Sequence, residues 1–432
     1  MLTRKKKLGV GLAMLAVTAL VGCSGGGAAD GGSGDSAKDV EVFTWWAQGS
    51  EKAGLEALEG VFAEQHPDFT FVNGSVAGGA GSAAKDLLQS RLQTNNPPDS
   101  FQAHAGEELA DYIEAGQLED VSALYDEYGL NDAFPSDLVD LLTVDGKIYS
   151  VPSNIHRSNV VWANNEVLEA AGIDPSTPPA DFDAWIADLD KVAAAGQTPL
   201  SVAQTWTQVN LLETVLMSSL GAEAYTGLFD GTTDWSGPEV TGALENFEKL
   251  MSYTNDDRDG LDWPEATQMV IDGQAAYNVM GDWAVAAFQQ ADKKDGEDFT
   301  YFEVPADNGN TDKIFGFLAD SFTLPVGAKN PDGAKAWLNT ISSVEGQEAF
   351  NLAKGSIPAR VDTDNSKFPA YQQTALQSFA EDKIAPSIAH GAATPIAWLN
   401  AISDATSQYT AGATDLAGYQ TALAEAADQY VK

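Results

Sequence analysis

Four tryptophans stand beside turn and polar residues rather than inside apolar runs. Trp45 and Trp46 end the stretch "VFTWW", Trp263 lies in "GLDWPEA", and Trp283 lies in "MGDWA". Because successive strand side chains point to opposite faces, one core would bury Trp45 or Trp46 but not both, which predicts exposed indoles. A flat apolar ring with a polar edge suits a sugar, whose axial hydrogens form an apolar patch ringed by hydroxyls.

Polar residues that suit sugar hydroxyls lie at other points of the chain. Hydroxyls both donate and accept hydrogen bonds, so a sugar site needs carboxylates, amides and amines. Gln102 and His104 are two residues apart in "DSFQAHA", so a strand would place both on one face. Asp320 interrupts the apolar segment "FGFLADSFTLP", where a carboxylate needs donors that a sugar or a lysine can provide.

Three other candidates have ordinary structural explanations. Asp282 precedes a predicted helix and fits an N-cap, Glu51 suits a helix N-terminus, and Lys354 before Gly355 suits a helix C-terminus. The histidines at 66, 104, 156 and 390 show no metal-ligand spacing, so we expect no metal and no cofactor. The sequence has no nucleophile elbow, phosphate loop or HExxH motif. Glycoside hydrolysis by a pair of carboxylates is not excluded, because it depends on the distance between the two carboxylates in space.

The N-terminus predicts export. Basic residues at 4–7 precede an apolar run from Leu8 to Val21, which is typical of a secretory signal and too short for a retained membrane span. The only cysteine, Cys23, ends the run and resembles the lipidated cysteine of a bacterial lipobox. Residues 24–38, "SGGGAADGGSGDSAK", predict a flexible tether.

The net charge limits the possible partners, and the cysteine count excludes an internal disulfide. A formal net charge of -40 would repel nucleic acid and anionic lipid surfaces, so neither is expected as a partner. With one cysteine the chain has no internal disulfide, and its stability must come from its core. The acidity itself is an ordinary property of soluble exported proteins and says little about a neutral ligand.

The pattern of elements predicts an α/β fold with two lobes. Strand and helix patterns alternate from residue 40 to 115, which is typical of a parallel sheet with helices on its faces. Ligands of such sheets bind beyond the carboxyl ends of the strands, where Trp45 and His104 are expected. A second α/β block follows from residue 147, which predicts a cleft between two lobes.

Several motifs together resemble one known family. The stretches are "FTWWA", "TNNPPDSFQAHAGEEL", "YSVPSNIHRSNVVWAN", "YNVMGDWA", "LADSFTLPVGAKN", "KGSIPAR" and "AHGAATP". From about Val40 to about Pro395 the chain resembles the extracellular sugar receptors of bacterial ABC importers, and within them the glucose/mannose-binding branch. The loop "AQGSEKAG" after Trp46 does not match the family pattern securely, which leaves Glu51 the least secure position.

The resemblance implies a two-lobed, type II periplasmic-binding-protein-like fold and a set of site residues. The implied ligand-binding residues are Trp45, Trp46, Glu51, Gln102, His104, Trp263, Asp282, Trp283, Asp320, Lys354 and His390. Trp206 and Gln208 are expected just behind them. The expected organisation is a signal peptide (1–22), a lipid-anchored tether (23–38), lobe 1 (39–151 plus 324–357) and lobe 2 (152–323 plus 358–432). Crossovers are expected near 150–153, 320–323 and 356–360.

The implied function is that of a receptor and not of an enzyme. A monomer anchored through Cys23 at the extracellular face of the cell membrane would close around a glucose- or mannose-type hexose and deliver it to membrane permease subunits. Two other functions stay open, a secreted glycoside hydrolase and a receptor of the same fold for another solute or an oligosaccharide. Incubation with disaccharides distinguishes a hydrolase from a receptor, since a receptor returns the disaccharides intact. Calorimetry with other solutes distinguishes a sugar receptor from a receptor for another solute.

Overall fold

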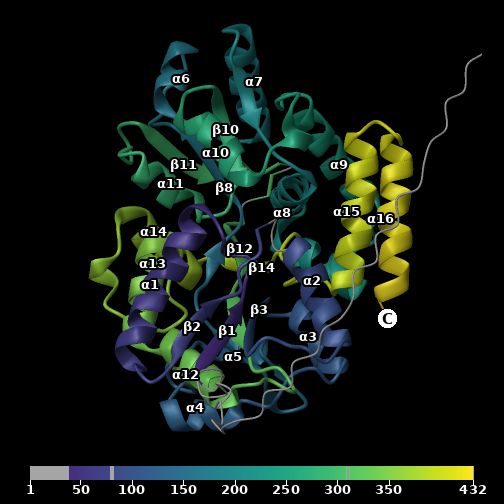
Figure 1. Ribbon diagram of the computed structural model, residues 1–432. Helices are drawn as coiled ribbons and strands as arrows, with labels where there is room; N and C mark the ends of the chain where they lie inside the picture. Colours follow the sequence, from purple (N-terminus) through teal and green to yellow (C-terminus); the bar gives the residue numbers. More distant parts are fainter. Residues whose placement is uncertain (1–37, 78–81, 308, 311, 432) are drawn as a thin grey trace, which may run out of the picture. The chain divides into compact units, whose positions relative to one another are not determined.

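The computed structural model describes residues 38–77, 82–307, 309–310 and 312–431 (Figure 1). The predicted signal, Cys23 and almost all of the tether lie outside the described residues. The strands are β1 (Asp39–Phe43), β2 (Thr70–Asn73), β3 (Ser100–His104), β4 (Thr143–Val144), β5 (Lys147–Ile148), β6 (Ser150–Pro152), β7 (His156–Arg157), β8 (Val160–Asn164), β9 (Thr198–Ser201), β10 (Ala275–Met280), β11 (Phe299–Glu303), β12 (Ile314–Leu318), β13 (Asp320–Thr323) and β14 (Lys383–Pro386).

The helices make up most of the remaining chain. They are α1 (Gly49–Gln65), α2 (Ser82–Gln93), α3 (Glu107–Glu114), α4 (Ser122–Tyr128), α5 (Ser136–Asp140), α6 (Asn165–Ala170), α7 (Phe182–Ala194), α8 (Thr205–Asp230), α9 (Pro238–Met251), α10 (Trp263–Ile271), α11 (Ala284–Gln290), α12 (Pro331–Ser342), α13 (Val344–Lys354), α14 (Ala370–Glu381), α15 (Ile396–Thr410) and α16 (Leu416–Tyr430). Short 3-10 helices cover Arg258–Gly260 and Asn365–Lys367. Among the described residues, no helix is both long and apolar enough to cross a membrane.

The first sheet has the strand order β2-β1-β3-β13-β6. β1 pairs in parallel with β2 and β3, as the alternating pattern predicts. β13 and β6 add to it antiparallel, and both lie outside the segment 40–115 for which the sequence predicts parallel strands. β13 follows β12 of the third sheet after the single residue Ala319, so one extended segment runs from the third sheet into the first. This pairing places Asp320 opposite His104.

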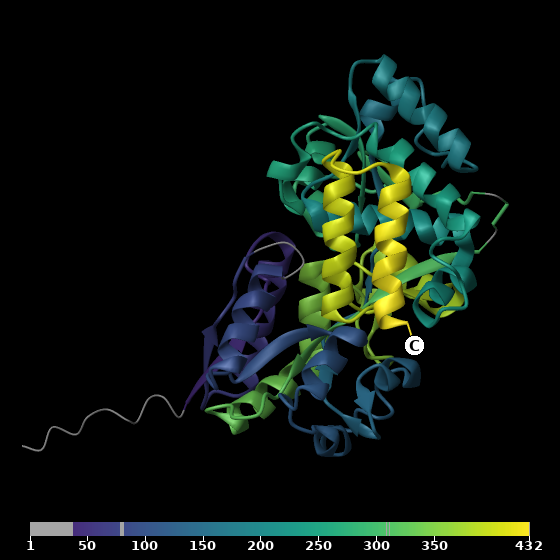
Figure 2. The same cartoon turned by 90° about the vertical axis from the view of Figure 1, so that its right-hand side faces the viewer.

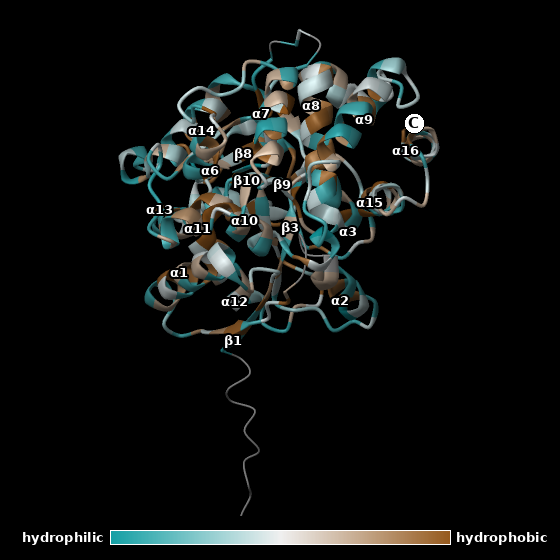
Figure 3. Ribbon diagram, turned by 90° about the horizontal axis from the view of Figure 1, so that it is seen from above, coloured by the Kyte–Doolittle hydropathy of each residue, from teal (hydrophilic) through white to brown (hydrophobic). Residues whose placement is uncertain are grey.

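A second sheet has the order β11-β8-β10-β9, and a third has the order β14-β12-β7. Buried apolar side chains form two clusters, one that includes the first sheet and one that includes β9 with α7, α8 and α9. Figure 3 shows hydrophobic residues on the central strands and more hydrophilic residues on the outer helices. The chain is mixed α/β with two cores, as the sequence predicts.

Three chain segments, near residues 153–155, 320 and 357, lie side by side between the first and third sheets. The backbone N–H of Ser153 donates to Asp320 O at 2.9 Å, and Ile155 exchanges backbone hydrogen bonds with Ile357 at 2.8 and 3.1 Å. These are the segments where the sequence predicts crossovers, and their role as a hinge stays a prediction. They also bring β7 and the start of β13 together, which matters for the site below.

The last two helices, α15 and α16, pack side by side as a hairpin (Figures 1 and 2). Tyr409 and Tyr419 stack with centroids 4.6 Å apart, and Trp398 stacks on Tyr430 at 5.6 Å. α15 also contacts α8 and α3. The backbone N–H of Ile396 at its start donates to Asp111 on α3 at 2.7 Å, which fixes this hairpin beside the loop that carries His390.

Candidate functional site

A cavity lies where the end of the first sheet meets the loops of the second and third sheets. It encloses no more than about 310 Å³ between protein atoms. Its lining residues are Trp45, Glu51, His104, His156, Trp206, Trp263, Trp283, Leu318, Asp320, Lys354 and His390. All except Glu51 and Trp206 are buried, so these two lie where the cavity is least covered.

Several elements place the aromatic walls. Trp45 follows the carboxyl end of β1, Trp206 lies in the first turn of α8, and Trp263 and Trp283 lie at the starts of α10 and α11. α10 begins there because Asp262 forms a capping box with Glu265, and Pro264 suits a first helical turn. The Trp283 ring meets those of Trp206 and Trp263 at 6.4 Å. The four indoles therefore surround the cavity from different parts of the chain.

The sequence prediction is only partly right about the tryptophan pair. Trp46 is fully buried, packs against Phe322 and Phe350, and does not line the cavity. Trp45 is 6% exposed, so the prediction of two exposed indoles is wrong. β1 ends at Phe43, and a turn follows in which Ala47 N–H donates to Trp45 O at 2.8 Å. Strand alternation therefore does not apply to these two residues, and both can face protein.

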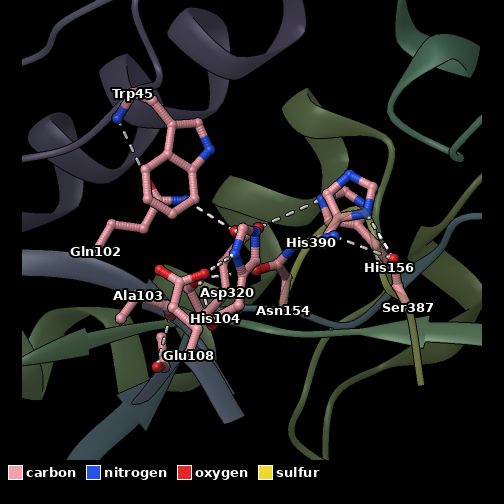
Figure 4. A network of polar contacts seen from close by, with 12 residues as sticks. Trp45, Gln102, Ala103, His104, Glu108, Asn154, His156, Asp320, Ser387 and His390 are labelled. Atoms are coloured by element: carbon pink, nitrogen blue, oxygen red, sulfur yellow. Dashed lines mark hydrogen bonds and ion pairs between the residues drawn. The ribbon is translucent and has the colours of Figure 1, made fainter. Parts of the chain in front are cut away.

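Asp320 is the central acidic residue of the cavity (Figure 4). Its Oδ1 accepts a hydrogen bond from Gln102 Nε2 at 2.7 Å and lies 3.5 Å from His104 Nε2. Its Oδ2 lies 3.5 Å from His156 Nε2. Burial raises the pKa of Asp320, but His104, Lys354 and the hydrogen bond from Gln102 oppose burial, and the pKa is lowered overall. Asp320 therefore presents an ionised acceptor to the cavity.

Gln102 supports Asp320 instead of lining the cavity. Its Oε1 accepts from the Thr44 hydroxyl and from Trp45 N–H, the latter at 3.4 Å. The Gln102 amide is thereby oriented with its NH2 toward Asp320 (Figure 4). Gln102 is 1% exposed, and both its amide oxygen and its amide nitrogen have partners within the protein.

Glu51 and Lys354 form a pair at the side of the cavity. Lys354 ends α13, and its Nζ lies 3.4 Å from Glu51 Oε1 in the first turn of α1. Burial raises the pKa of Glu51 to about 7, with Lys354 opposing and Asp320 adding to the shift. Lys354 also lies over the rings of Trp46 and Trp283, at 5.5 and 5.9 Å. Although Glu51 is the least secure position in the sequence, it is brought to the cavity.

Three histidines face the cavity, each with its Nδ1 bonded on the far side. His104 Nδ1 lies 2.7 Å from Glu108 Oε2, and His390 Nδ1 lies 2.8 Å from Ser387 Oγ. His156 Nδ1 bonds to Asp282 Oδ1. Burial lowers the pKa of His156 and of His390 well below the usual value, and cationic neighbours lower both further. These two imidazoles are therefore neutral, with one donor and one acceptor nitrogen each.

Two further predicted residues lie away from the cavity. Asp282 is fully buried behind His156, and Trp283, not Asp282, caps α11. Gln208 donates to Ala203 O and to Asp259, at 3.0 and 2.9 Å, which explains it as structural. Trp206, predicted just behind the site, lines the cavity directly.

His156 and Leu318 line the cavity but were not predicted. The signal for His156 was available in the segment 153–159, "SNIHRSN", where a run of polar residues lies between two apolar strands. Its polar members are all buried in the structure. Leu318 gives no signal, because it is one apolar residue in an apolar strand. Among the described residues, no group of three or more His, Cys, Asp or Glu is arranged to hold a metal ion.

A larger hollow lies on the other side of Trp206. It encloses up to about 870 Å³ and is lined by residues of α2, α8 and α15 and by Ala389. Lys85 and Asn400 contribute its amine and amide groups. Lys85 also lies over the ring of Trp45, at 5.3 Å, and donates to Glu108 at 2.8 Å. The hollow and the cavity thus share Trp206 as a wall.

Comparisons with known proteins agree with this architecture. The sequence matches the family described as "Bacterial extracellular solute-binding protein" over residues 27–348. It is 34% identical over 410 residues to an uncharacterized ABC transporter extracellular-binding protein of Pyrococcus horikoshii, covering 92% of this chain and 91% of that one. It is 33% identical to a probable sugar-binding periplasmic protein of Mesorhizobium japonicum, covering 87% and 89%.

A solved structure shows the same fold. The bacterial solute receptor AcbH, whose reported preference is for β-D-galactopyranose, superposes with a TM-score of 0.79 at 20% identity. The superposition covers 91% of this chain and 99% of the receptor. This likeness confirms the predicted two-lobed fold.

Proposed function

This chain belongs to the family of bacterial extracellular solute-binding proteins, and we propose that it is a monosaccharide receptor of an ABC importer. The observation that carries this proposal is the composition of the cavity, which joins indole faces to carboxylates, an amine and imidazoles. Indoles provide stacking surfaces for a pyranose, and the polar groups match hydroxyls that both donate and accept. The relatives and the receptor named above, one of them a sugar-binding protein by name, support the same class of ligand.

The size of the cavity supports a single sugar ring. All the space between protein atoms in the cavity, open solvent included, is about 310 Å³, which leaves room for no more than one sugar ring. The resemblance of "PPDSFQAHAG" and "NIHRSNVVW" to the glucose/mannose-binding branch supports a glucose- or mannose-type hexose. Trp45, Glu51, His104, Trp263, Trp283, Asp320, Lys354 and His390 are the predicted ligand contacts that the cavity retains.

Contacts across the cavity support a closure mechanism. Gln48 Nε2, before α1, donates to Asp262 Oδ2 at 3.1 Å, and Ser50 Oγ donates to Trp283 O at 3.1 Å. Sugar bound between the two sides favours the closed state only through contacts with both. We further propose that the mature protein is a monomer anchored by lipid at Cys23 to the extracellular membrane face, where it delivers its sugar to permease subunits.

The test is a titration by calorimetry or tryptophan fluorescence with D-glucose, D-mannose, D-galactose and D-xylose. We expect saturable binding of at least one sugar, with a fluorescence change because four indoles line the cavity. Incubation with maltose and cellobiose, followed by chromatography, is the parallel test for hydrolysis, and unchanged disaccharide is expected. Binding of none of the four monosaccharides would contradict the proposal.

One observation favours an oligosaccharide as a second candidate ligand. The hollow beyond Trp206 is larger than the cavity and carries Lys85 and Asn400, which could bind the hydroxyls of a further ring. Maltose binding more tightly than D-glucose, with the advantage lost in Trp206→Ala, would select this candidate. Equal or weaker binding of maltose would favour the single ring.

A further inference from the structure

His156 carries a buried polar atom that the protein leaves without a hydrogen bond. The residue is 1% exposed and lines the cavity, and its Nε2 has no hydrogen-bond partner among the described residues. An unpaired buried donor or acceptor costs free energy, so such an atom in a binding cavity points to a ligand partner. His156 was not among the predicted contacts, and no resemblance assigned it a role.

The nearest polar atom restricts where that partner lies. His156 Nε2 and Asp320 Oδ2 are 3.5 Å apart, which is too long for a direct hydrogen bond (Figure 4). A hydroxyl oxygen about 2.8 Å from each atom satisfies both distances. Because Asp320 is an ionised acceptor, the hydroxyl must donate to Asp320 and accept from His156. This requires a proton on Nε2.

Asp282 determines where the proton of His156 lies. Its Oδ2 accepts the backbone N–H of Arg157 at 3.0 Å, which leaves Oδ1 as the atom that bonds to His156 Nδ1. Burial raises the pKa of Asp282 well above its usual value, which favours a protonated Oδ1 that donates to Nδ1. A neutral imidazole that accepts at Nδ1 carries its hydrogen on Nε2.

We propose that His156 is a ligand-contacting residue that donates from Nε2 to the same sugar hydroxyl that donates to Asp320, with Asp282 as its positioning residue. The inference rests on the proposed function, since it names one contact within the same cavity. It assigns specificity to the pair, because a ring without a hydroxyl at this point leaves both buried groups unpaired. A site built to bond a hydroxyl rejects analogues that lack it.

The first test replaces His156 and varies the sugar. His156→Asn keeps an amide near the position of Nδ1 but removes Nε2, and we expect its affinity for the tightest-binding monosaccharide to fall about tenfold to a hundredfold. The same titrations use each monodeoxy derivative of that sugar. For the derivative that lacks the bridging hydroxyl, wild type and His156→Asn should bind within about twofold, since the contact is already absent. A purely structural role would weaken all derivatives equally.

The second test addresses the positioning residue. In Asp282→Asn the amide oxygen still accepts from Arg157 and the NH2 donates to His156 Nδ1, so we expect a loss of affinity below about threefold. Asp282→Leu removes the donor, and we expect a loss comparable to that of His156→Asn. His66→Asn, at a half-buried histidine beside Phe62 and outside the cavity, is the matched control for unchanged binding. Circular dichroism and thermal melting confirm that each variant is folded.

The outcomes separate the inference from the function. If wild type binds none of the four monosaccharides, the proposed function and the His156 contact are both overturned. If wild type binds and His156→Asn binds equally well, or loses the same factor for every deoxy derivative, only the contact is overturned. If Asp282→Asn loses as much affinity as His156→Asn, the donor assignment of His156 is overturned, because Asn can support only the imidazole that carries its proton on Nε2.

Discussion

Two buried glutamates lie behind two of the cavity histidines, and their pKa values are shifted in opposite directions. Glu108 accepts from Lys85 Nζ at 2.8 Å and bonds to His104 Nδ1 at 2.7 Å. Burial raises its pKa, but Lys85 and His104 outweigh burial and bring the pKa to about 2. Glu108 is therefore ionised and paired with a cation.

Glu213 has only uncharged partners. Both of its oxygens accept from Ser387 Oγ at 2.9 Å, and Oε2 also accepts from the backbone N–H of Ala389. Burial raises its pKa to about 7, although these hydrogen bonds oppose the shift. Ser387 in turn bonds to His390. We call Lys85, His104, Glu108 and Asp320 the charged side of the cavity, and Glu213, Ser387, His390 and Trp263 the neutral side.

The comparison teaches that burial alone does not decide the charge of a carboxylate. Glu108 and Glu213 are both fully buried, and the difference in pKa follows from Lys85 and His104 beside Glu108. A polar sugar thus meets a fixed charge on one side and uncharged dipoles with an indole face on the other. The following changes test this contrast, from the largest expected effect to the smallest.

Removal of the cation of the charged side should be the most costly change. In Lys85→Met the buried Glu108 loses the amine that donates to its Oε2, and breaking such a pair costs about 3–5 kcal/mol. The free energy of unfolding from urea denaturation measures the loss. Lys294→Met, at an exposed pair with Glu297, is the control and should change stability by less than about 0.5 kcal/mol. Equal effects of the two substitutions would contradict the contrast.

Removal of the acceptor of the charged side should have the largest effect on binding. Asp320→Asn keeps the shape of the side chain but loses the ionised acceptor, and we expect affinity to fall by about 2–3 kcal/mol, roughly thirtyfold to more than a hundredfold. Calorimetry with the sugar that wild type binds tightest measures the change. The control is Glu297→Gln at the exposed pair with Lys294, which should leave affinity unchanged.

Removal of an indole from the neutral side should cost less. Trp263→Ala deletes the stacking surface at the start of α10, and we expect a loss of about 1–3 kcal/mol, up to about a hundredfold in affinity. Trp398→Phe, in the stack with Tyr430 on the C-terminal hairpin, is the matched control. An unchanged dissociation constant in Trp263→Ala would remove this residue from the site.

The smallest expected effect comes from Glu213 on the neutral side, whose protonation makes the free energy of unfolding depend on pH. Between the ordinary pKa of 4.5 and the folded value of about 7, Glu213 is protonated in the folded state and ionised in the unfolded state. The folded state therefore binds more protons, and the free energy of unfolding falls as pH rises through this window. We expect a contribution of about 1 kcal/mol between pH 5.5 and 6.5.

Glu213→Gln should remove that contribution, so its stability curve should be flatter than that of wild type over the same range. Glu51, whose pKa is also raised to about 7, contributes with the same sign and stays in both proteins. Glu108 has the opposite sign, since its lowered pKa gives stability above pH 4.5 that is lost as pH falls toward 2. Identical slopes for wild type and Glu213→Gln would contradict the assignment.

The fold could be predicted from the sequence because its signals are local and periodic. The alternation of strands and helices from residue 40 to 115 is present in the structure, with small differences at the ends of elements. The antiparallel β13 could not be predicted in the same way, because its partner β3 is more than two hundred residues away in the chain. Its direction depends on tertiary pairing that no local pattern records.

The site was predictable where a residue broke a local rule. Asp320 inside an apolar strand and Trp263 in a turn were both singled out, and both line the cavity. Two of the residues that were wrongly predicted to contact the ligand support residues that line the cavity. Gln102 bonds to Asp320, and Asp282 bonds to His156. The polar stretch 153–159 marked the segment, but His156 itself was missed because all polar residues of the stretch are buried and the sequence does not show which of them faces the cavity.

The near-complete burial of the cavity walls has a kinetic consequence. Nine of the eleven lining residues are buried, and only Glu51 and Trp206 are partly exposed. A molecule the size of a sugar ring cannot leave past such walls unless they separate, so each departure requires an opening of the protein. The residence time of a bound solute then has a lower limit set by the rate of that motion, common to all solutes however weakly each is held.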